Sequence, residues 1–242
     1  SSRIRADVNT AFDTDFSDAT LRGARMTGAK MKSANFTNAL LEEADFTSAN
    51  LENADFTNTV MSGVQLMGST THDAIMDRVV HAPSSEALAR RPALLEALAG
   101  HQVWCLTNGK QGGAAQVEGA DLRVVGDVLA AGQLTGLQAP GACFGRLNLE
   151  GAFLQAANLE GADLRGANLR GADLRGARLP GANLARADLR GAILTHMEIG
   201  GRTTATDLTG ARFSYADCRG ALLSPGQLDF ADTAEARFDK AA

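Results

Sequence analysis

Residues 162–181 decide the fold: they read ADLRG ANLRG ADLRG ARLPG, four units of five residues in succession. A large apolar residue recurs at every fifth position, and Ala stands two residues before it. An α-helix repeats every 3.6 residues and a β-strand every two, so neither element gives this period. The stretch therefore predicts a unit made of a short extended piece followed by a corner.

The same period extends far beyond this stretch. With the large apolar residue called the centre, centres run from Phe16 to Leu66, from Phe144 to Ile199, and from Leu208 to Leu223. Gly or Asn after a centre suits a turn with positive φ, and Asp or Asn before it can bond the turn backbone. Four such sides close a coil of about 20 residues, and coils stack about 4.8 Å apart.

Stacking places residues that are 20 apart in one column. Alternation of side chains in the extended piece turns the centre and the preceding Ala inward, so a narrow channel is expected. The composition agrees, because the chain has 26 Gly but only ten Phe, one Tyr and one Trp. The expected channel residues include Phe16, Phe36, Phe56, Leu149, Leu169 and Leu189.

The repeats resemble those of the pentapeptide-repeat family, whose consensus is A-[DN]-L-x-x, over roughly residues 14–68 and 142–225. The resemblance implies an all-β solenoid, a right-handed quadrilateral β-helix, here in two blocks with a small α-helical insert. We expect an N-terminal block at 1–70, the insert or cap at 71–119, and a C-terminal block with a short tail at 120–242.

The insert carries the signals of helices. Ser84–Glu86 suits a helix start, Pro92 suits a first turn, and Gly109 suits a stop. An apolar stripe at helical spacing predicts that the insert caps an open coil end, although the pattern does not say which block it caps. The candidate cap residues are Leu94, Leu98, His101 and Trp104.

A second interruption separates Ile199 from Leu208, which lie nine residues apart instead of five or ten. Either one residue is lost from the repeat or four form a bulge. Gly200–Thr204 (GGRTT) favours a protruding loop, which makes Arg202 a candidate contact. The phase is also uncertain over 120–142, where Leu122 is out of step.

Charge and composition exclude several functions. The net charge is −5, spread as −3 over 1–70, −1 over 71–119, 0 over 120–199 and −1 over 200–242. No segment is a basic footprint, so direct nucleic-acid binding is not expected. No apolar stretch is long enough for a membrane span. Three cysteines without a CxxC motif fit free thiols in a reducing, cytoplasmic compartment.

The sequence contains no catalytic constellation. Its four histidines are scattered, and only His101 and Cys105 share a spacing that suits metal ligands, without a second pair. We therefore expect no enzyme activity, no cofactor and no metal site.

Two functions of different classes remain. The first is a scaffold or protein–protein interaction module, whose candidate contacts are Arg165, Arg170, Arg175, Arg190 and Arg202. These arginines also fit a solvated face balanced by neighbouring aspartates. The second function is implied by the family resemblance alone: mimicry of duplex DNA to bind and protect or inhibit DNA gyrase or topoisomerase IV. A homodimer through the coil ends is compatible with both.

Overall fold

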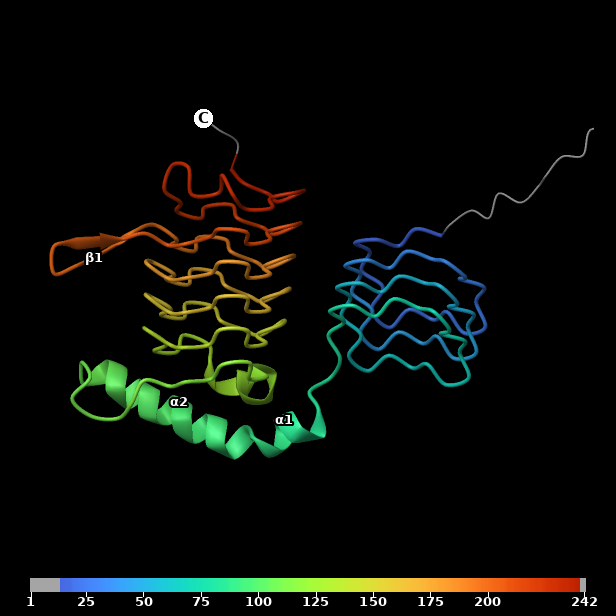
Figure 1. The fold of residues 1–242 in the computed structure, drawn as a ribbon, viewed down its shortest axis with the longest axis horizontal. Coiled ribbons are helices and arrows are strands. Elements are labelled where there is room, and N and C mark those ends of the chain that lie inside the picture. The colour runs from blue at the N-terminus through green and yellow to red at the C-terminus, as the bar shows by residue number, and fades with distance from the viewer. Residues whose placement is uncertain (1–13, 240–242) are drawn as a thin grey trace, which may run out of the picture. The chain divides into compact units, whose positions relative to one another are not determined.

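The computed structural model describes residues 14–239. It divides into two compact units, Ser1–Ala82 (unit 1) and Pro83–Ala242 (unit 2), each built around a stack of coils (Figure 1). The helices and strands all belong to unit 2: α1 (Ser85–Ala89), α2 (Arg91–Leu106), the 3₁₀-helix η1 (Leu122–Val128), β1 (Met197–Ile199) and β2 (Arg202–Thr204).

Parallel β-bridges between residues 20 apart define the coils. Within one turn of the chain there is one bridge for each of four sides. In unit 1 these are Asp15↔Asn35, Thr20↔Leu40, Arg25↔Asp45 and Lys30↔Asn50, and in unit 2 Cys143↔Asp163, Asn148↔Asn168, Phe153↔Asp173 and Asn158↔Arg178.

The backbone hydrogen bonds explain why five residues make one side. The N–H of the centre Leu164 donates to Asn183 O at 2.8 Å, and the N–H of Gly166 donates to Ala185 O at 2.9 Å, both in the next coil. The N–H of Asp163 donates back to Ala142 O of the preceding coil at 2.9 Å. Each side is therefore tied to the coils on both sides of it, and no coil is complete alone.

The corner follows from two local bonds. The N–H of Ala167 donates to Leu164 O at 3.0 Å, and Gly166 between them has φ 63°, as the third position of a type II turn requires. The remaining amide of the turn, that of Arg165, donates to Asp163 Oδ1 at 3.1 Å. The Asp or Asn before each centre is therefore a fixed part of the turn.

Both channels are filled by apolar side chains. In unit 1 the rings of Phe36 and Phe56 stack with centroids 4.9 Å apart and an interplanar angle of 2°. Phe16, whose side chain is partly buried in the first coil, stacks on Phe36 at 5.2 Å. In unit 2 the centres are mostly leucines, among them Leu149, Leu169 and Leu189 at 0% exposure.

Three local features differ from the sequence expectations. The bridges of unit 1 continue past residue 70 to Val60↔Val80, so the coils run ten residues beyond the expected boundary. In unit 2 Asp121 pairs with Cys143, 22 residues on, while Gln133 pairs with Phe153. The two extra residues lie in the corner that η1 occupies, which explains the phase shift around Leu122.

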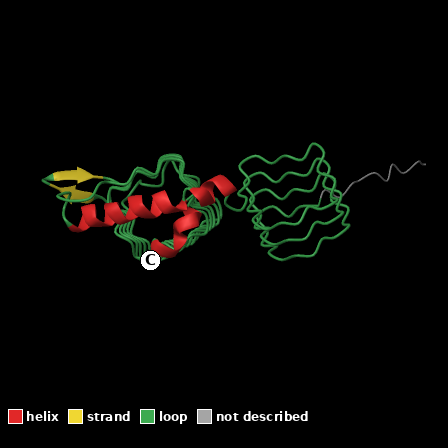
Figure 2. Cartoon of the chain, turned by 90° about the horizontal axis from the view of Figure 1, so that it is seen from below, coloured by secondary structure: helices red, strands yellow, loops and turns green. Residues whose placement is uncertain are grey.

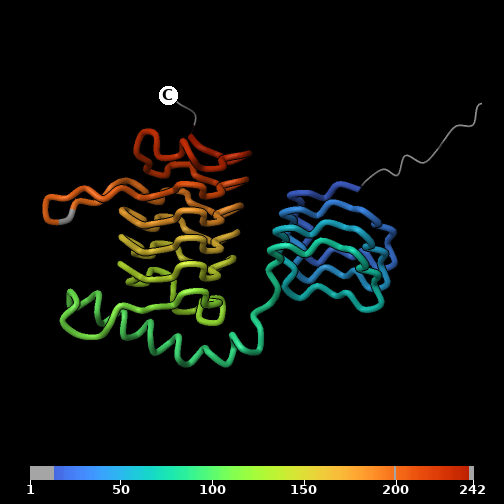
Figure 3. The backbone as a smooth tube through the Cα atoms, viewed as in Figure 1, coloured from blue at the N-terminus to red at the C-terminus, as the bar shows by residue number. Residues whose placement is uncertain are grey.

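The largest difference is at the second interruption. Arg178 pairs with Asp207, 29 residues on instead of 20, so nine residues are inserted. They form an antiparallel hairpin of β1 and β2 that projects from the stack (Figure 3). Gly200 and Gly201 at its tip have φ 56° and 76°, which suits a two-residue hairpin turn. The expected repeat position at Ile199 therefore falls in β1, outside the coil.

Helix α2 lies across the first coil of unit 2 (Figures 1 and 2). Its buried residues are Leu94, Leu98 and His101, and the two leucines belong to the same apolar cluster as the channel. Pro92 stands in the first turn, where its missing N–H costs no hydrogen bond.

Candidate interaction face

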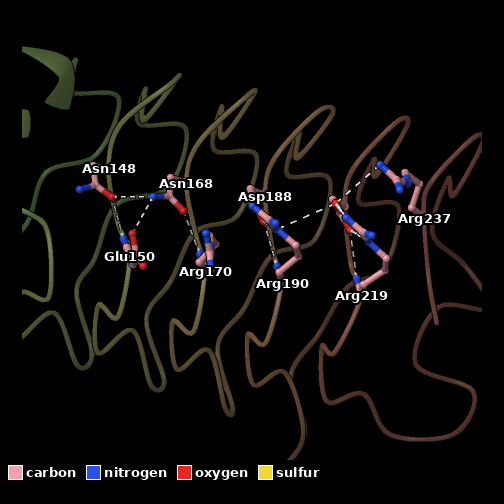
Figure 4. A network of polar contacts seen from close by, with 9 residues as sticks. Asn148, Glu150, Asn168, Arg170, Asp188, Arg190, Arg219 and Arg237 are labelled. Atoms are coloured by element: carbon pink, nitrogen blue, oxygen red, sulfur yellow. Dashed lines mark hydrogen bonds and ion pairs between the residues drawn. The ribbon is translucent and has the colours of Figure 1, made fainter.

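One side of unit 2 carries a regular ladder of polar side chains, which we call the arginine face (Figure 4). Its residues precede and follow successive channel centres and repeat at the spacing of the coils. They form one column of Asn148, Asn168, Asp188, Asp217 and Arg237, joined by bridges, and a second column of Glu150, Arg170, Arg190 and Arg219.

An Asp-x-Arg clip fixes two of the four arginines of the face, Arg190 and Arg219. In the Asp188 clip, Oδ1 accepts the N–H of Arg190 at 3.2 Å and its Nε at 2.8 Å, and Oδ2 accepts Nη2 at 2.5 Å. Asp217 and Arg219 repeat the same contacts, with Oδ2 accepting Nη2 at 2.6 Å. Each clip neutralises its own arginine and holds the side chain flat along the face.

The clips also connect neighbouring coils. Arg190 Nε lies 3.9 Å from Asp217 Oδ2, and Arg237 Nη1 lies 3.9 Å from the same oxygen. The hydrogen bond from the Arg219 side chain, the Arg219 N–H and the charges of Arg219 and Arg237 lower the pKa of Asp217 to about 2. The pKa of Asp188 is lowered first by the Arg190 side chain and, among weaker causes, by the charge of Arg170.

Arg170 is different because Asn168 takes the place of the aspartate. Asn168 Oδ1 accepts the N–H of Arg170 at 3.2 Å, and its Nδ2 donates to Asn148 Oδ1 at 2.9 Å and to Glu150 Oε2 at 3.1 Å. Within residues 14–239 the guanidinium of Arg170 has no hydrogen bond or ion pair, and the residue is exposed. Its charge is therefore available to an anionic group.

The structure separates the five arginines singled out from the sequence. Arg170 and Arg190 share the arginine face, whereas Arg165 and Arg175 lie on the two flanking sides. Arg165 is only 8% exposed and is bound in a clip with Asp163, and Arg175 is bound by Asp173. Arg202 is exposed on β2 of the hairpin.

The sequence reasoning missed Arg219 and Arg237. Both follow the hairpin. Arg219 lies 29 residues, and not 20, beyond Arg190, and Arg237 lies 20 residues beyond Asp217, which is itself 29 residues beyond Asp188. The signal was present, because Asp217-Cys218-Arg219 repeats the pattern of Asp188-Leu189-Arg190. Leaving out the nine inserted residues would have placed it in the same column.

The candidate cap residues meet at the end of the unit 2 stack. His101 Nδ1 accepts the N–H of Ala115 at 3.1 Å, and its ring stacks on Trp104 with centroids 5.6 Å apart. Cys105 Sγ lies 3.6 Å from His101 Nε2. Burial lowers the pKa of His101, and burial raises that of Cys105. His101 and Cys105 therefore help to hold helix α2 against the stack.

No described group of three or more His, Cys, Asp or Glu side chains is arranged to hold a metal ion. Cys105, Cys143 and Cys218 are free thiols. Neither described helix has the length and apolarity that a bilayer-crossing helix requires.

The chain is similar to several proteins of known structure. Among solved structures, a trypsin-treated variant of QnrB1, described as a plasmid-mediated fluoroquinolone resistance protein, is 19% identical; the match covers 93% of this chain and 77% of that one, with a TM-score of 0.37. HetL, a pentapeptide-repeat protein involved in heterocyst differentiation regulation in the cyanobacterium Nostoc, is 22% identical over 93% of this chain and 87% of its own, with a TM-score of 0.29.

No curated protein sequence matches the chain. A family model described as pentapeptide repeats matches eight copies, over residues 13–38, 34–70, 142–179 and 167–198, in both units. With its five-residue sides and its bridges between residues 20 apart, the chain belongs to the pentapeptide-repeat family.

Proposed function

We propose that both stacks are right-handed quadrilateral β-helices and that the protein is a non-enzymatic, cytoplasmic interaction module or scaffold that holds a partner protein. The observation that carries this proposal is the preorganised arginine face. Asp188 and Asp217 hold the side chains of Arg190 and Arg219 by several hydrogen bonds each, so a partner that docks on these two arginines loses little side-chain entropy. The three free thiols support a reducing location.

The face suits protein docking better than catalysis. The carboxylates of Asp188 and Asp217 accept hydrogen bonds from arginines and turn amides, which lower their pKa values, so neither is poised as an acid or base near neutral pH. It offers instead a regular series of charged groups at the coil spacing, with Arg170 unpaired among the described residues.

The test is capture of a partner by mild crosslinking in the protein's own host, compared across matched variants. Replacing Arg170 and Arg190 with Ser, together with Asp188→Asn, removes three charges from the middle of the arginine face. Asp173→Asn with Arg175→Ser and Arg178→Ser changes the same number of charges on other sides. A stoichiometric partner should be lost only with the first set. Equal capture by both sets, or no stoichiometric partner, would refute docking on this face.

The second candidate is mimicry of duplex DNA by unit 1. Residues 14–80 carry nine acids and five bases, a net charge of −4. Their coils extend over about 16 Å at the strand spacing. B-DNA of that length carries roughly nine negative charges, so unit 1 reaches about half the charge density. This deficit ranks mimicry below the interaction module. If the purified protein inhibits supercoiling by gyrase, mimicry becomes the first candidate. If gyrase is unaffected, mimicry is excluded.

A further inference from the structure

The two ends of the coil stack in unit 1 leave different backbone groups unpaired. We call the coil of residues 61–80 the donor end and the coil of residues 14–33 the acceptor end. One coil before the donor end, the N–H of Phe46 donates to Gln65 O at 2.9 Å. The equivalent N–H groups at the donor end have no hydrogen bond to a described residue; they include those of Leu66, Gly68, Thr71, Asp73 and Met76. The donor end is therefore an open edge of amides.

The acceptor end carries the matching carbonyl groups. In the coil that follows it, such carbonyls are occupied, as when the N–H of Phe16 donates to Asn35 O at 2.7 Å. The equivalent carbonyls at the acceptor end accept no hydrogen bond from a described residue; they include those of Asp15, Ser17, Thr20, Arg22 and Arg25. Because every side of both coils has five residues, these acceptors have the same spacing as the amides of the donor end.

The charges of the two ends are also complementary. The acceptor end carries four basic and two acidic side chains, a net charge of +2. The donor end carries two acidic side chains and one basic side chain, a net charge of −1 when its histidine is neutral. Contact between unlike ends is therefore attractive, whereas contact between two acceptor ends is repulsive.

Neither end closes the channel of unit 1. At the donor end the centre Leu66 is partly buried and the centre Met76 is 37% exposed. At the acceptor end the centres Phe16 and Leu21 are partly buried, whereas Phe36 in an inner coil is 0% exposed. Stacking one end on the other would remove this apolar surface from water.

We propose that unit 1 binds a second copy of this chain head to tail, with the acceptor end of one copy on the donor end of the other. Asp15 O of the second copy then accepts the N–H of Leu66, and the pairing continues every five residues along both chains. This register leaves room for both chains, because the bridged coil ends at Val80, before the position that Thr14 of the second copy takes. The assembly involves unit 1 alone and does not depend on the arginine face.

A second copy fits the donor end better than any other part of the same molecule. The donor and acceptor ends lie at opposite ends of one stack (Figure 1), so unit 1 cannot pair with itself. The first coil of unit 2 is covered by α2, whose Leu94 and Leu98 pack on its channel. An interface between unlike ends does not close, so the copies should form open chains whose length grows with concentration.

One ion pair across the stacked ends tests the register. In unit 2 a side chain that follows a centre reaches the side chain 18 residues on, as Glu160 Oε2 reaches Arg178 Nη2 at 3.1 Å. In the proposed register Arg25 of the second copy follows the Met76 position by one coil, so Asp77 has this same relation to it. Asp77 and Arg25 are both exposed in unit 1. They should therefore attract each other across the interface.

Sedimentation velocity of the full chain at low salt, over about a hundredfold range of concentration, measures the association. The wild type should sediment faster as its concentration rises, and added salt should weaken this effect. Asp77→Arg and Arg25→Asp each place like charges across the interface and should each weaken association about tenfold or more. The matched control is Glu43→Arg, because it makes the same change of charge as Asp77→Arg in an inner coil. It should change the association less than twofold.

An equimolar mixture of Asp77→Arg and Arg25→Asp separates a direct contact from a folding defect. Each donor end in the mixture can meet an acceptor end of opposite charge on the other variant, so association should return. A wild type that stays monomeric at every concentration would overturn the proposal, as would an equal loss in Glu43→Arg. A mixture that stays dissociated, or a closed dimer that neither charge reversal affects, would also overturn it. These variants leave unit 2 unchanged, so the capture experiment on the arginine face tests the proposed function separately.

Discussion

In unit 1 the channel is filled by stacked aromatic rings, Phe36 and Phe56 with Phe46 at an edge, whereas in unit 2 it is filled mainly by leucines. Both sets of side chains are fully buried at the same coil spacing. The first coil of unit 1 has only partly buried centres, among them Phe16 and Leu21, while the first coil of unit 2 is covered by α2. The channel therefore requires volume at each centre, and either flat rings or branched chains supply it.

The outward positions differ in another way. In unit 1 most of the corners with positive φ are not glycine, as at Asn38 and Asn53, and Asp45 and Asp55 have Thr two residues on. In unit 2 most of these corners are Gly, and aspartates such as Asp188 and Asp217 have Arg two residues on. In both units the Asp or Asn oxygen accepts the amide two residues on. That bond is required by the fold, and the next side chain is free to serve a partner.

The largest effect should come from a charge placed in the leucine channel. Leu169→Lys buries an ammonium group with no partner, so the free energy of unfolding should fall by about 4 kcal/mol or more. Arg170→Ala, one residue further and outward, should change it by less than about 0.5 kcal/mol. Guanidinium denaturation followed by Trp104 fluorescence measures both. Equal effects would contradict the inward and outward assignment of this pentad.

Exchanging the two kinds of channel centre should have an intermediate effect. Leu169→Phe inserts a ring among close-packed leucines and should cost about 1–3 kcal/mol. Phe36→Leu removes stacking on Phe16 and Phe56, which is worth about 0.5–1.5 kcal/mol, and loses some buried area. Thermal unfolding followed by circular dichroism measures both variants. A leucine tolerated at Phe36 without loss would show that the rings in unit 1 only fill space.

The stability of unit 2 should fall in mild acid because of the buried histidine in its cap. Unit 1 has no comparable buried histidine among its described residues. Burial lowers the pKa of His101, so the unfolded chain, at about its ordinary value of 6.5, binds the proton first. The stability that neutral His101 contributes is complete above pH 6.5 and falls as the pH drops below it. The slope should reach at most about 1.4 kcal/mol per pH unit.

His101→Asn is the control, because an amide oxygen can replace Nδ1 as the acceptor of the Ala115 N–H but does not titrate. Unfolding of wild type and variant between pH 5 and 8, followed by Trp104 fluorescence, should show the pH dependence only in the wild type. Since Trp104 stacks on the ring, its fluorescence reports the same site. The same pH dependence in both proteins would assign it to other groups.

Particular residues show how much of the fold could be predicted from the sequence. Centres such as Leu169 could be predicted because the channel permits only large apolar side chains there. The helix of the cap could be predicted from its apolar stripe. Gly200–Thr204 indicated a protruding loop, and a hairpin projects there. Its strands and its length of nine residues could not be predicted, because the repeat gave only the alternatives of one lost residue or four added ones, and Thr206 restores the stack by contacts that no repeat encodes. Its hydroxyl accepts the N–H of Gly176 and lies 2.9 Å from Leu174 O and Thr195 O.

The candidate site was less predictable. The five arginines look equal in sequence, yet a single atom change from Asp to Asn, at Asn168, separates the unpaired Arg170 from the clipped Arg175 and Arg190. Arg165 is buried and is paired with Asp163 in its own clip. The clip itself is local, because the aspartate stands two residues before its arginine. The contacts between coils, such as that of Arg190 Nε with Asp217 Oδ2, depend on neighbours that a linear pattern does not place together.

The smallest expected effect is a difference in salt dependence between the arginine clips of unit 2 and the threonine contacts of unit 1. Asp217→Asn keeps an acceptor for the Arg219 amide, as Asn168 does for Arg170, and removes only the charge shared with Arg190, Arg219 and Arg237. Because the pairs are exposed in part, the loss should be below about 1 kcal/mol and should shrink in high salt. The carboxylate's contribution is present above its ordinary value of 3.8 and is lost as the pH falls towards its folded pKa of about 2.

Asp45→Asn is the matched change in unit 1. Asp45 bonds the Thr47 N–H at 2.9 Å and the Thr27 hydroxyl at 3.0 Å. Its hydrogen-bond partners are neutral, and the charge of Arg25 is the weakest of the causes that lower its pKa, so the effect of Asp45→Asn on unfolding should depend less on salt than that of Asp217→Asn. Urea unfolding of both variants at low and high sodium chloride makes the comparison. An equal salt dependence would mean that the clips act through their hydrogen bonds and not through charge, and the arginine face would then owe its preorganisation to the turn alone.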